Sequence, residues 1–269
     1  MINVETFLAE TLKGLPEDHP DRKAISGMLA SAQKHTGAHE EVLVKLTLVD
    51  QDRQLRDAMR PFVQEYSAAA VHTPDLINQT WQGIWKVIGE RVEYAYQVPA
   101  CDRTPEELAQ LQKESRAVLL LPSDIYTPEG LVRLGRTFPL MRSWTTDPKE
   151  AARISHGSNT GGCIDIEMNP YAPYRTSKGY NQQELVDRII ADGRGGQRLP
   201  TYLVGSQFSQ LLTERYFDIN TWSRLLGSSH GGSMLCAYFY SGGEASVNYW
   251  DPQNQYPYLG GRSEGVKRA

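Results

Sequence analysis

Residues 217 to 266 read FDINTWSRLLGSSHGGSMLCAYFYSGGEASVNYWDPQNQYPYLGGRSEGV, and the pattern of this stretch is the main basis for predicting the fold class. Two runs with strand-like alternation, Leu235–Tyr240 and Ala245–Trp250, flank the turn residues 241–244. Such runs on either side of a short Gly-containing turn predict a β-hairpin. We therefore expect a strand-rich C-terminal module that packs on the preceding part of the chain, because its apolar residues need a surface against which to be buried.

The composition is that of a globular protein. The 269 residues are 40% hydrophobic and 22% charged, both ordinary values, and this length allows one large domain or two modest ones. The net charge of −4 argues against a nucleic-acid partner, since nucleic-acid-binding chains usually carry a basic face. The sequence contains no apolar run of membrane-spanning length and no secretory signal, so we expect no membrane partner and a cytoplasmic location.

The chain before the C-terminal stretch divides by pattern into a helical region, residues 1–100, and a mixed body that begins at residue 101. Apolar residues recur at helical spacing through most of the first region. Trp81 and Trp85 lie on one face of a predicted helix, and we interpret them as core residues rather than as a stacking platform. Pro61 is expected to kink or divide an earlier helix.

Strands and helices alternate in the body, and the C-terminal end is rich in strands, so the fold class is predicted to be α+β. The strands are expected at Ala117–Leu121, around Arg142–Trp144 and, half-buried, at Gly162–Met168; the helices are expected after Thr104 and Thr127, at Pro148–Arg153, at Asn181–Ala191 and at Leu203–Tyr216. The Gly-rich segments 155–162 and 193–198 are interpreted as a turn and a solvated connector.

Short motifs accompany this pattern from Ala117 onward. They are Leu121-Pro122, Thr127-Pro128-Glu129, Phe138-Pro139 before Trp144, Leu211-Leu212, Phe217-Asp218-Ile219, Trp222, Gly227-Ser228 and Leu259–Arg262. In these motifs the chain resembles a group of uncharacterised microbial proteins, and its end is similar to the variable regions of proteins diversified by retroelements. That resemblance implies a C-type-lectin-like module over about residues 217–266, on which mutation of adenine-containing codons places Asn, Tyr, Ser, Asp and His.

The same module is crowded with side chains that are typical of binding surfaces. Aromatic rings provide contact area at low entropic cost, and small polar groups provide adaptable hydrogen bonds. The predicted ligand-binding residues are His230, Tyr238, Tyr240, Asn248, Trp250, Gln253, Asn254, Tyr256 and Tyr258. Alternation places Tyr238 and Tyr240 on one face and Phe239 on the other, so one set is displayed. The alternative is that these aromatic residues have only a structural role, as ordinary residues of β-strands.

These residues predict a non-enzymatic binding or display protein with no cofactor. Its partner would be a protein or another macromolecule, because the surface is shallow and aromatic rather than a deep polar cleft. Gly242, Gly243, Gly260, Gly261 and Arg262 are assigned to the scaffold.

Two alternatives remain open at the level of sequence. One is a thiol-dependent hydrolase in which Cys163 uses His156 or His230, with Asp165 as an orienting acid. No familiar motif surrounds Cys163, and the spacing of the three cysteines predicts neither a metal site nor a disulfide framework, so we expect no catalytic and no metal-binding residue. The other is a structural subunit that oligomerises through its helical N-terminal region.

Overall fold

The computed structural model describes residues 4–17, 19, 21–32 and 39–266. Contacts divide the chain into two compact units, one ending at Gln54 and the other beginning at Leu55. The first unit contains α1 (Val4–Gly14), α2 (Asp21–Ala32) and the beginning of α3 (His39–Ala68). Its own small core includes Leu8, Ile25 and Leu46.

The second unit contains the remaining helices. They are the end of α3, α4 (Pro74–Val92), α5 (Pro105–Lys113), α6 (Pro128–Thr137), α7 (Pro148–Ala151), α8 (Gln182–Ala191) and α9 (Leu199–Thr213). The predicted start signals are confirmed at α5 and α6, where the hydroxyls of Thr104 and Thr127 accept backbone N–H groups of the first turn. None of the helices in the described part of the chain combines the length and the apolar character that crossing a membrane requires.

Helix α3 continues through Pro61, so of the two effects expected of this proline the division of the helix does not occur. The strand expected around Arg142–Trp144 is absent from the described fold, and a 3-10 turn over Trp144–Thr146 takes its place. That turn is favoured because the Ser143 N–H donates to the Thr146 hydroxyl and this hydroxyl donates to the Ser143 carbonyl, which offers the backbone a local alternative to strand pairing.

The strands form two sheets, and with the helices they make the predicted α+β fold with a strand-rich C-terminal part. One sheet has the order β1-β3-β9-β4, and the other has the order β2-β5-β6-β7 with β8 paired to β5. The strands of the first sheet are β1 (Arg116–Leu121), β3 (Gly162–Glu167), β4 (Gly195–Gly196) and β9 (Ser263–Val266). Those of the second are β2 (Ile154–His156), β5 (Trp222–His230), β6 (Ser233–Phe239), β7 (Ala245–Tyr249) and β8 (Leu259–Gly261).

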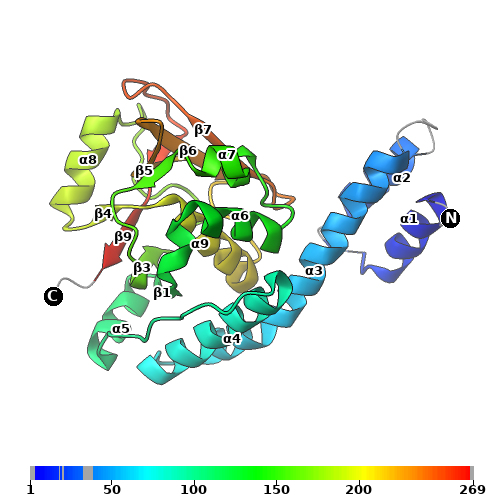
Figure 1. The fold of residues 1–269 in the computed structure, drawn as a ribbon, viewed down its shortest axis with the longest axis horizontal. Helices are drawn as coiled ribbons and strands as arrows, with labels where there is room; N and C mark the ends of the chain where they lie inside the picture. Colours follow the sequence, from blue (N-terminus) through cyan, green and yellow to red (C-terminus); the bar gives the residue numbers. More distant parts are fainter. Residues whose placement is uncertain (1–3, 18, 20, 33–38, 267–269) are drawn as a thin grey trace. The chain divides into compact units, whose positions relative to one another are not determined.

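The edge strand β1 is covered by helix α4, which lies along it on the lower side of the body in Figure 1. The indole N–H groups of Trp81 and Trp85 donate to the carbonyls of Val118 and Leu120, at 2.8 and 2.7 Å. Both tryptophans are almost fully buried, so their interpretation as core residues is confirmed. The two bonds also pair carbonyl groups on a strand edge that would otherwise be open to other strands.

Strand β3 differs from its prediction in the extent of its burial. Residues 163–166 are all buried, whereas the alternation indicated one exposed face. Asp165 is accommodated there because Arg103, Arg116 and Arg194 bind its carboxylate. A buried carboxylate of this kind requires such partners.

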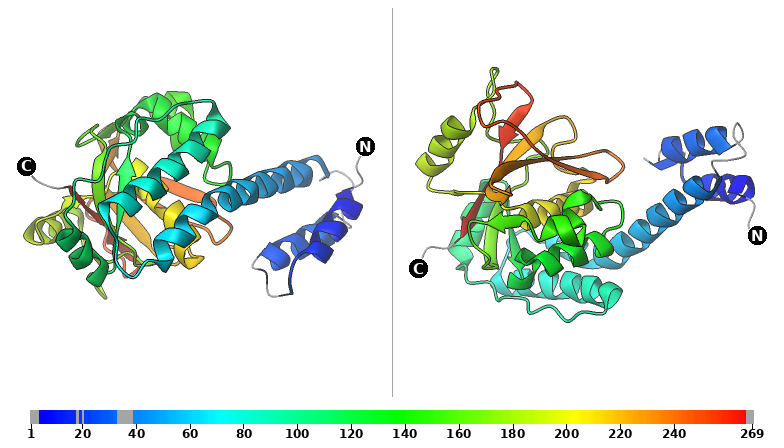
Figure 2. Two further views of the ribbon diagram at one scale, coloured as in Figure 1. Left: turned by 90° about the horizontal axis from the view of Figure 1, so that it is seen from below. Right: turned by 45° about the horizontal axis from the view of Figure 1, so that its top comes forward.

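The β6–β7 hairpin is confirmed, and its inner face belongs to the main core. Leu235, Ala237 and Phe239 are fully buried, and the Phe239 ring packs on Tyr202 of α9 and on Tyr216. Figure 2 shows the hairpin in orange to brown as a long curved ribbon. The C-terminal module is therefore packed on the body, as its apolar alternation predicts.

Candidate functional site

The outer face of the second sheet carries the candidate site. On β6, Tyr238 lies between two buried neighbours and is itself half-buried, so alternation directs it away from the core. The register pairs Arg224 of β5 with Cys236, which places Trp222 opposite Tyr238 on the same face. The outer face is therefore lined by side chains from both strands.

Residues 250–258, which we call the outer loop, lie across this face. The fully buried guanidinium group of Arg224 donates to the carbonyl of Asn254 at 2.6 Å, and it makes longer bonds to the carbonyls of Asp251 and Pro252. The Trp222 amide donates to the Tyr258 carbonyl at 2.8 Å. A single arginine beneath the loop thus fixes its middle, and strand pairing fixes its end.

The beginning of helix α8 holds the outer loop from the side. The Gln182 amide donates to the Pro252 carbonyl at 2.9 Å, and the Gln255 side chain donates to Glu184 at 2.9 Å. Gly179 approaches so closely that a Cβ there would lie 2.4 Å from the Tyr256 carbonyl oxygen, and its φ of +81° also favours glycine. The loop is consequently bound on two sides.

Six rings gather where the outer loop meets the sheet, and we call this set the aromatic surface. Its members are Trp222, Tyr238, Tyr240, Trp250, Tyr256 and Tyr258. Ring centroids are 4.1 Å apart for Trp222 and Tyr238 and 5.0 Å apart for Trp222 and Trp250. Tyr256 and Tyr258 are parallel at 5.4 Å, and both stand nearly perpendicular to Trp250. Tilted, edge-on and offset contacts of this kind are favourable between rings.

The aromatic surface combines fixed rings with exposed ones. Trp222, Tyr238 and Trp250 are half-buried beneath their neighbours. Tyr240, Tyr256 and Tyr258 expose 48%, 39% and 43% of their surface, and they are among the most exposed large apolar residues of the described chain. Exposed aromatic rings on a rigid base are typical of interaction sites.

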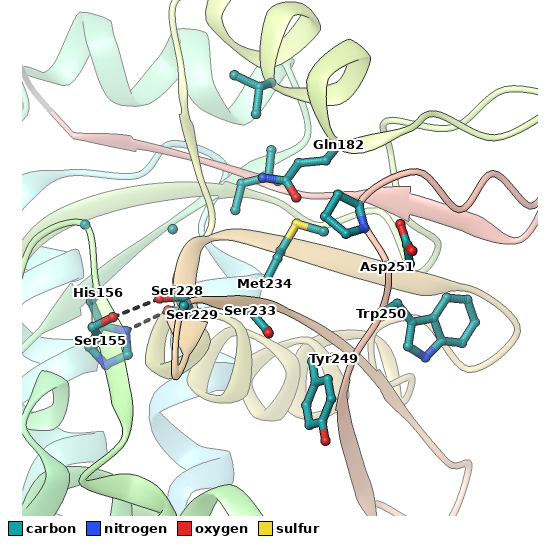
Figure 3. Close-up of a pocket in the computed structure, with 16 residues that line it drawn as sticks. Ser155, His156, Gln182, Ser228, Ser229, Ser233, Met234, Tyr249, Trp250 and Asp251 are labelled. Carbon is teal, nitrogen blue, oxygen red and sulfur yellow. Dashed lines mark hydrogen bonds between the residues drawn. The ribbon is translucent and has the colours of Figure 1, made fainter.

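A cavity of about 790 Å³ lies beside the outer loop on the same sheet face. Figure 3 shows Trp250 and Asp251 on one side of it, Gln182 above, and His156 with Ser228 on the opposite side. Its polar lining residues include Ser155, Ser228, Ser229 and Ser233. Trp250 belongs both to this cavity and to the aromatic surface, so the two features adjoin.

His156 is held in its neutral form at the edge of the cavity. Its Nδ1 lies 2.6 Å from the Ser228 oxygen, which also accepts the Leu199 amide at 2.8 Å. Ser228 therefore joins the His156 ring to the first residue of α9. Burial, together with the positive charge of Arg198, lowers the pKa of His156 to about 4. Because the His156 imidazole is a weak base and the Ser228 hydroxyl is already hydrogen-bonded, we interpret the two as a structural pair.

The structure brings most of the predicted binding residues together. Tyr238, Tyr240, Trp250, Tyr256 and Tyr258 belong to the aromatic surface, Gln253 and Asn254 lie on the outer loop, and Asn248 is exposed on the adjoining strand β7. Sequence reasoning missed Trp222 as a member of the aromatic surface and Arg224 as the support of the loop. The position of Trp222 ahead of a Ser- and Gly-rich run gives no local signal for either role.

His230 does not belong with this group. It is 6% exposed, its Nε2 lies 2.8 Å from Glu150, and its ring contacts Trp144 at 4.8 Å between centroids. On β5 it lines a neighbouring hollow together with Arg153 and Tyr249. A buried, paired imidazole offers little contact area, so His230 is a weaker candidate than the rings.

The parts of the thiol hydrolase hypothesis are engaged elsewhere. The sulfur of Cys163 lies 3.8 Å from the sulfur of Cys101, and Asp165 binds three arginines. His156 bonds to Ser228, and His230 bonds to Glu150. The hypothesis remains a prediction, with none of these contacts joining thiol, imidazole and carboxylate.

The Gly-rich segment 193–198 is not the solvated connector that its sequence indicates. Arg198 is 4% exposed, and it binds Glu264 and the carbonyls of Ser158 and Thr160. Arg194 binds Asp165 on the first sheet. Arg198 therefore ties strand β9 to the loop between β2 and β3, and Arg194 supports the first sheet.

Among the described residues, no group of three or more His, Cys, Asp or Glu side chains is arranged to hold a metal ion. No protein-family model, curated protein sequence or solved structure matches this chain.

Proposed function

We propose that this protein is a non-enzymatic binding protein that holds a segment of another macromolecule, most simply a protein, on its aromatic surface. The observation that carries the proposal is the arrangement of six neighbouring rings, three on the outer loop that Arg224 and the start of α8 hold in place and three on or beside strands β5 and β6. A rigid loop loses little conformational entropy on binding, and Tyr and Trp are enriched among residues that dominate interface energies.

The charge of the site favours a protein over a nucleic acid. Residues 231–258 contain the carboxylates Glu244 and Asp251 but no Lys or Arg. Phosphate groups would find no positive side chain on this stretch, whereas proteins bind through surfaces with an aromatic centre and a polar rim. Asn248, Gln253 and Asn254 supply such a rim in this proposal.

The test is selection of peptides from a displayed random library against the purified chain, followed by measurement of the dissociation constant of a selected peptide. The triple change of Tyr238, Tyr256 and Tyr258 to alanine is expected to weaken that binding by at least about thirtyfold, since one hot-spot residue is typically worth about 2 kcal/mol. Tyr171→Ala is the matched control, because Tyr171 is 38% exposed but belongs to the segment after β3.

The circular dichroism spectrum separates loss of binding from loss of fold. Tyr256→Ala alone serves as a second variant if the triple variant unfolds, because Tyr256 is 39% exposed. A folded variant that binds a peptide selected on the unmodified protein with undiminished affinity would place the binding surface elsewhere.

Diversification of this surface by a retroelement is a further part of the proposal, and it rests on the sequence resemblance. Related sequences from one population would test it, because substitutions should concentrate at the displayed positions of residues 238–258. A neighbouring reverse transcriptase gene with a template repeat would support the same idea.

A further inference from the structure

Two cysteines that are far apart in the sequence lie next to each other in the body. Cys101 belongs to the segment without regular structure that connects α4 to α5, and Cys163 belongs to β3. Their sulfur atoms are 3.8 Å apart, close enough for a thiol–thiol hydrogen bond. A disulfide bond requires about 2.05 Å between the sulfurs, so the gap to be closed is short.

We infer that Cys101 and Cys163 form a redox-active dithiol, a modification site at which a hydroperoxide produces an intramolecular disulfide. The bond would tie the α4–α5 connector to the central strand β3. The connector would move to bring the two sulfurs together, because β3 is held by pairing on both edges, with β1 and β9. Cys236 is the third cysteine, and it is buried on β6 in the other sheet.

The two sulfurs are not equivalent, and this difference assigns their roles. Cys101 is partly exposed, whereas Cys163 is 4% exposed. The hydrogen bond from the Cys163 thiol lowers the pKa of Cys101 to about 7, despite partial burial, and the Arg103 amide assists. The same contact, together with burial, raises the pKa of Cys163. Cys101 is therefore the accessible thiolate, and Cys163 is the resolving thiol.

The chemistry needs only the hydroperoxide as oxidant. The Cys101 thiolate attacks the terminal oxygen, the O–O bond breaks, and the leaving alkoxide or hydroxide takes a proton, which leaves a sulfenic acid on Cys101. The Cys163 sulfur then attacks the Cys101 sulfur, the S–O bond breaks, and the departing hydroxide takes the thiol proton as water. Two thiols are oxidised, one peroxide is reduced, and a dithiol reagent reverses the change.

The experiment treats the full-length reduced chain with a small excess of hydrogen peroxide, counts free thiols, and maps the oxidised cysteines by mass spectrometry without reduction. The expected result is loss of two thiols, a mass lower by two hydrogens, and one peptide pair joining Cys101 to Cys163. The thermal unfolding midpoint should rise by several degrees, because the cross-link restricts the unfolded chain. Added dithiothreitol should restore all three thiols.

Three single variants separate the roles. Cys236→Ser is the matched control and should still lose two thiols. Cys163→Ser should accumulate a sulfenic acid on Cys101 that dimedone traps, whereas Cys101→Ser should retain both of its thiols. Circular dichroism checks the fold, and Cys163→Ala replaces Cys163→Ser if the hydroxyl group is not tolerated in the core.

The inference is overturned if the unmodified chain keeps three thiols under these conditions, or if the disulfide joins Cys236 or two molecules. Equal dimedone labelling of Cys101 in the unmodified and Cys163→Ser proteins would also overturn it, because no resolving step would then have occurred.

Discussion

Asp218 and Arg262 form a two-point ion pair that is shut off from solvent, with 2.9 Å between Oδ2 and Nε and 3.0 Å between Oδ1 and Nη2. The two residues are 0% and 1% exposed, and the guanidinium group also lies over the Phe217 ring, 3.8 Å from its centroid. This pair joins the Phe-Asp-Ile motif to the Leu-x-x-Arg motif. The expectation that Arg262 serves the scaffold is therefore confirmed.

Replacing Arg262 with methionine is expected to lower the free energy of unfolding by about 3–5 kcal/mol, because it leaves the Asp218 carboxylate buried without its counter-charge. Equilibrium unfolding in guanidinium chloride measures the change. Arg188→Met is the control, since Arg188 pairs with Asp192 on the exposed face of α8 and such pairs contribute at most about 1 kcal/mol. Equal effects of the two substitutions would contradict the buried-pair account.

Arg224→Met is expected to release the outer loop while preserving most of the side-chain volume beneath it. The variant loses the donors to the carbonyls of Asp251, Pro252 and Asn254. Amide hydrogen exchange of residues 250–258 should accelerate, while exchange in the β1–β3 ladder should change little. Unchanged protection of the outer loop would show that the contacts with α8 alone fix it.

The protein should lose stability on acidification through the titration of His156. The unfolded imidazole has a pKa of about 6.5, and the folded one has a pKa of about 4, so between these values the unfolded chain binds more protons. The stability that the neutral His156 imidazole contributes is fully present above about pH 6.5. The free energy of unfolding then falls by up to about 3 kcal/mol as the pH approaches 4.

The part of this pH dependence that comes from His156 can be measured with the His156→Gln variant. The denaturant midpoint is compared at pH 7 and pH 4.5 in the unmodified protein and in the variant. The variant should show the weaker pH dependence. Burial also lowers the pKa of His72, but that group is present in both proteins and cancels in the comparison. Identical pH slopes would exclude His156 as the source.

Trp222 should behave as a binding residue although its sequence position does not indicate that role. Its ring is adjacent to both Tyr238 and Trp250, so its removal deprives the aromatic surface of its base. Trp222→Leu is expected to lower the affinity for a selected peptide by about tenfold or more, whereas Trp222→Phe should retain most of that affinity. Titration followed by intrinsic fluorescence or calorimetry provides the measurement, and equal affinities for all three proteins would exclude the role.

Local signals in the sequence were sufficient to predict the helices and the hairpin. Threonine caps followed by proline mark α5 and α6, and the alternation of residues 235–249 marks β6 and β7. These patterns work because each element satisfies its own hydrogen bonds through near neighbours.

Strand β5 was not predicted because little in its own sequence resembles a strand. Its second half is rich in Ser and Gly, and its register with β6 shifts between Leu225 and Ser229. Strands β4, β8 and β9 are short and Gly-containing, and they exist because distant segments pair with them. Such pairing depends on tertiary contacts rather than on propensity.

The residue types of the candidate site could be predicted from the sequence, but their arrangement in space could not. The crowding of Tyr, Trp, Asn and Gln identified most of the aromatic surface. The separation of His230 from the aromatic surface and the membership of Trp222 in it were both hidden for one reason, which is that proximity in sequence does not determine which residues meet. The same limit hid the contact between Cys101 and Cys163, which are 62 positions apart.

The outer loop is anchored mainly through its main chain. Carbonyl oxygens of Asp251, Pro252, Asn254 and Tyr258 receive the bonds from Arg224, Gln182 and Trp222, so these contacts do not depend on which side chains the loop carries. At positions 253, 256 and 258 the side chain can therefore change while the backbone path is retained. The fold separates the residues that specify structure from those that specify recognition, and a combinatorial library at these three positions would begin from one shared framework.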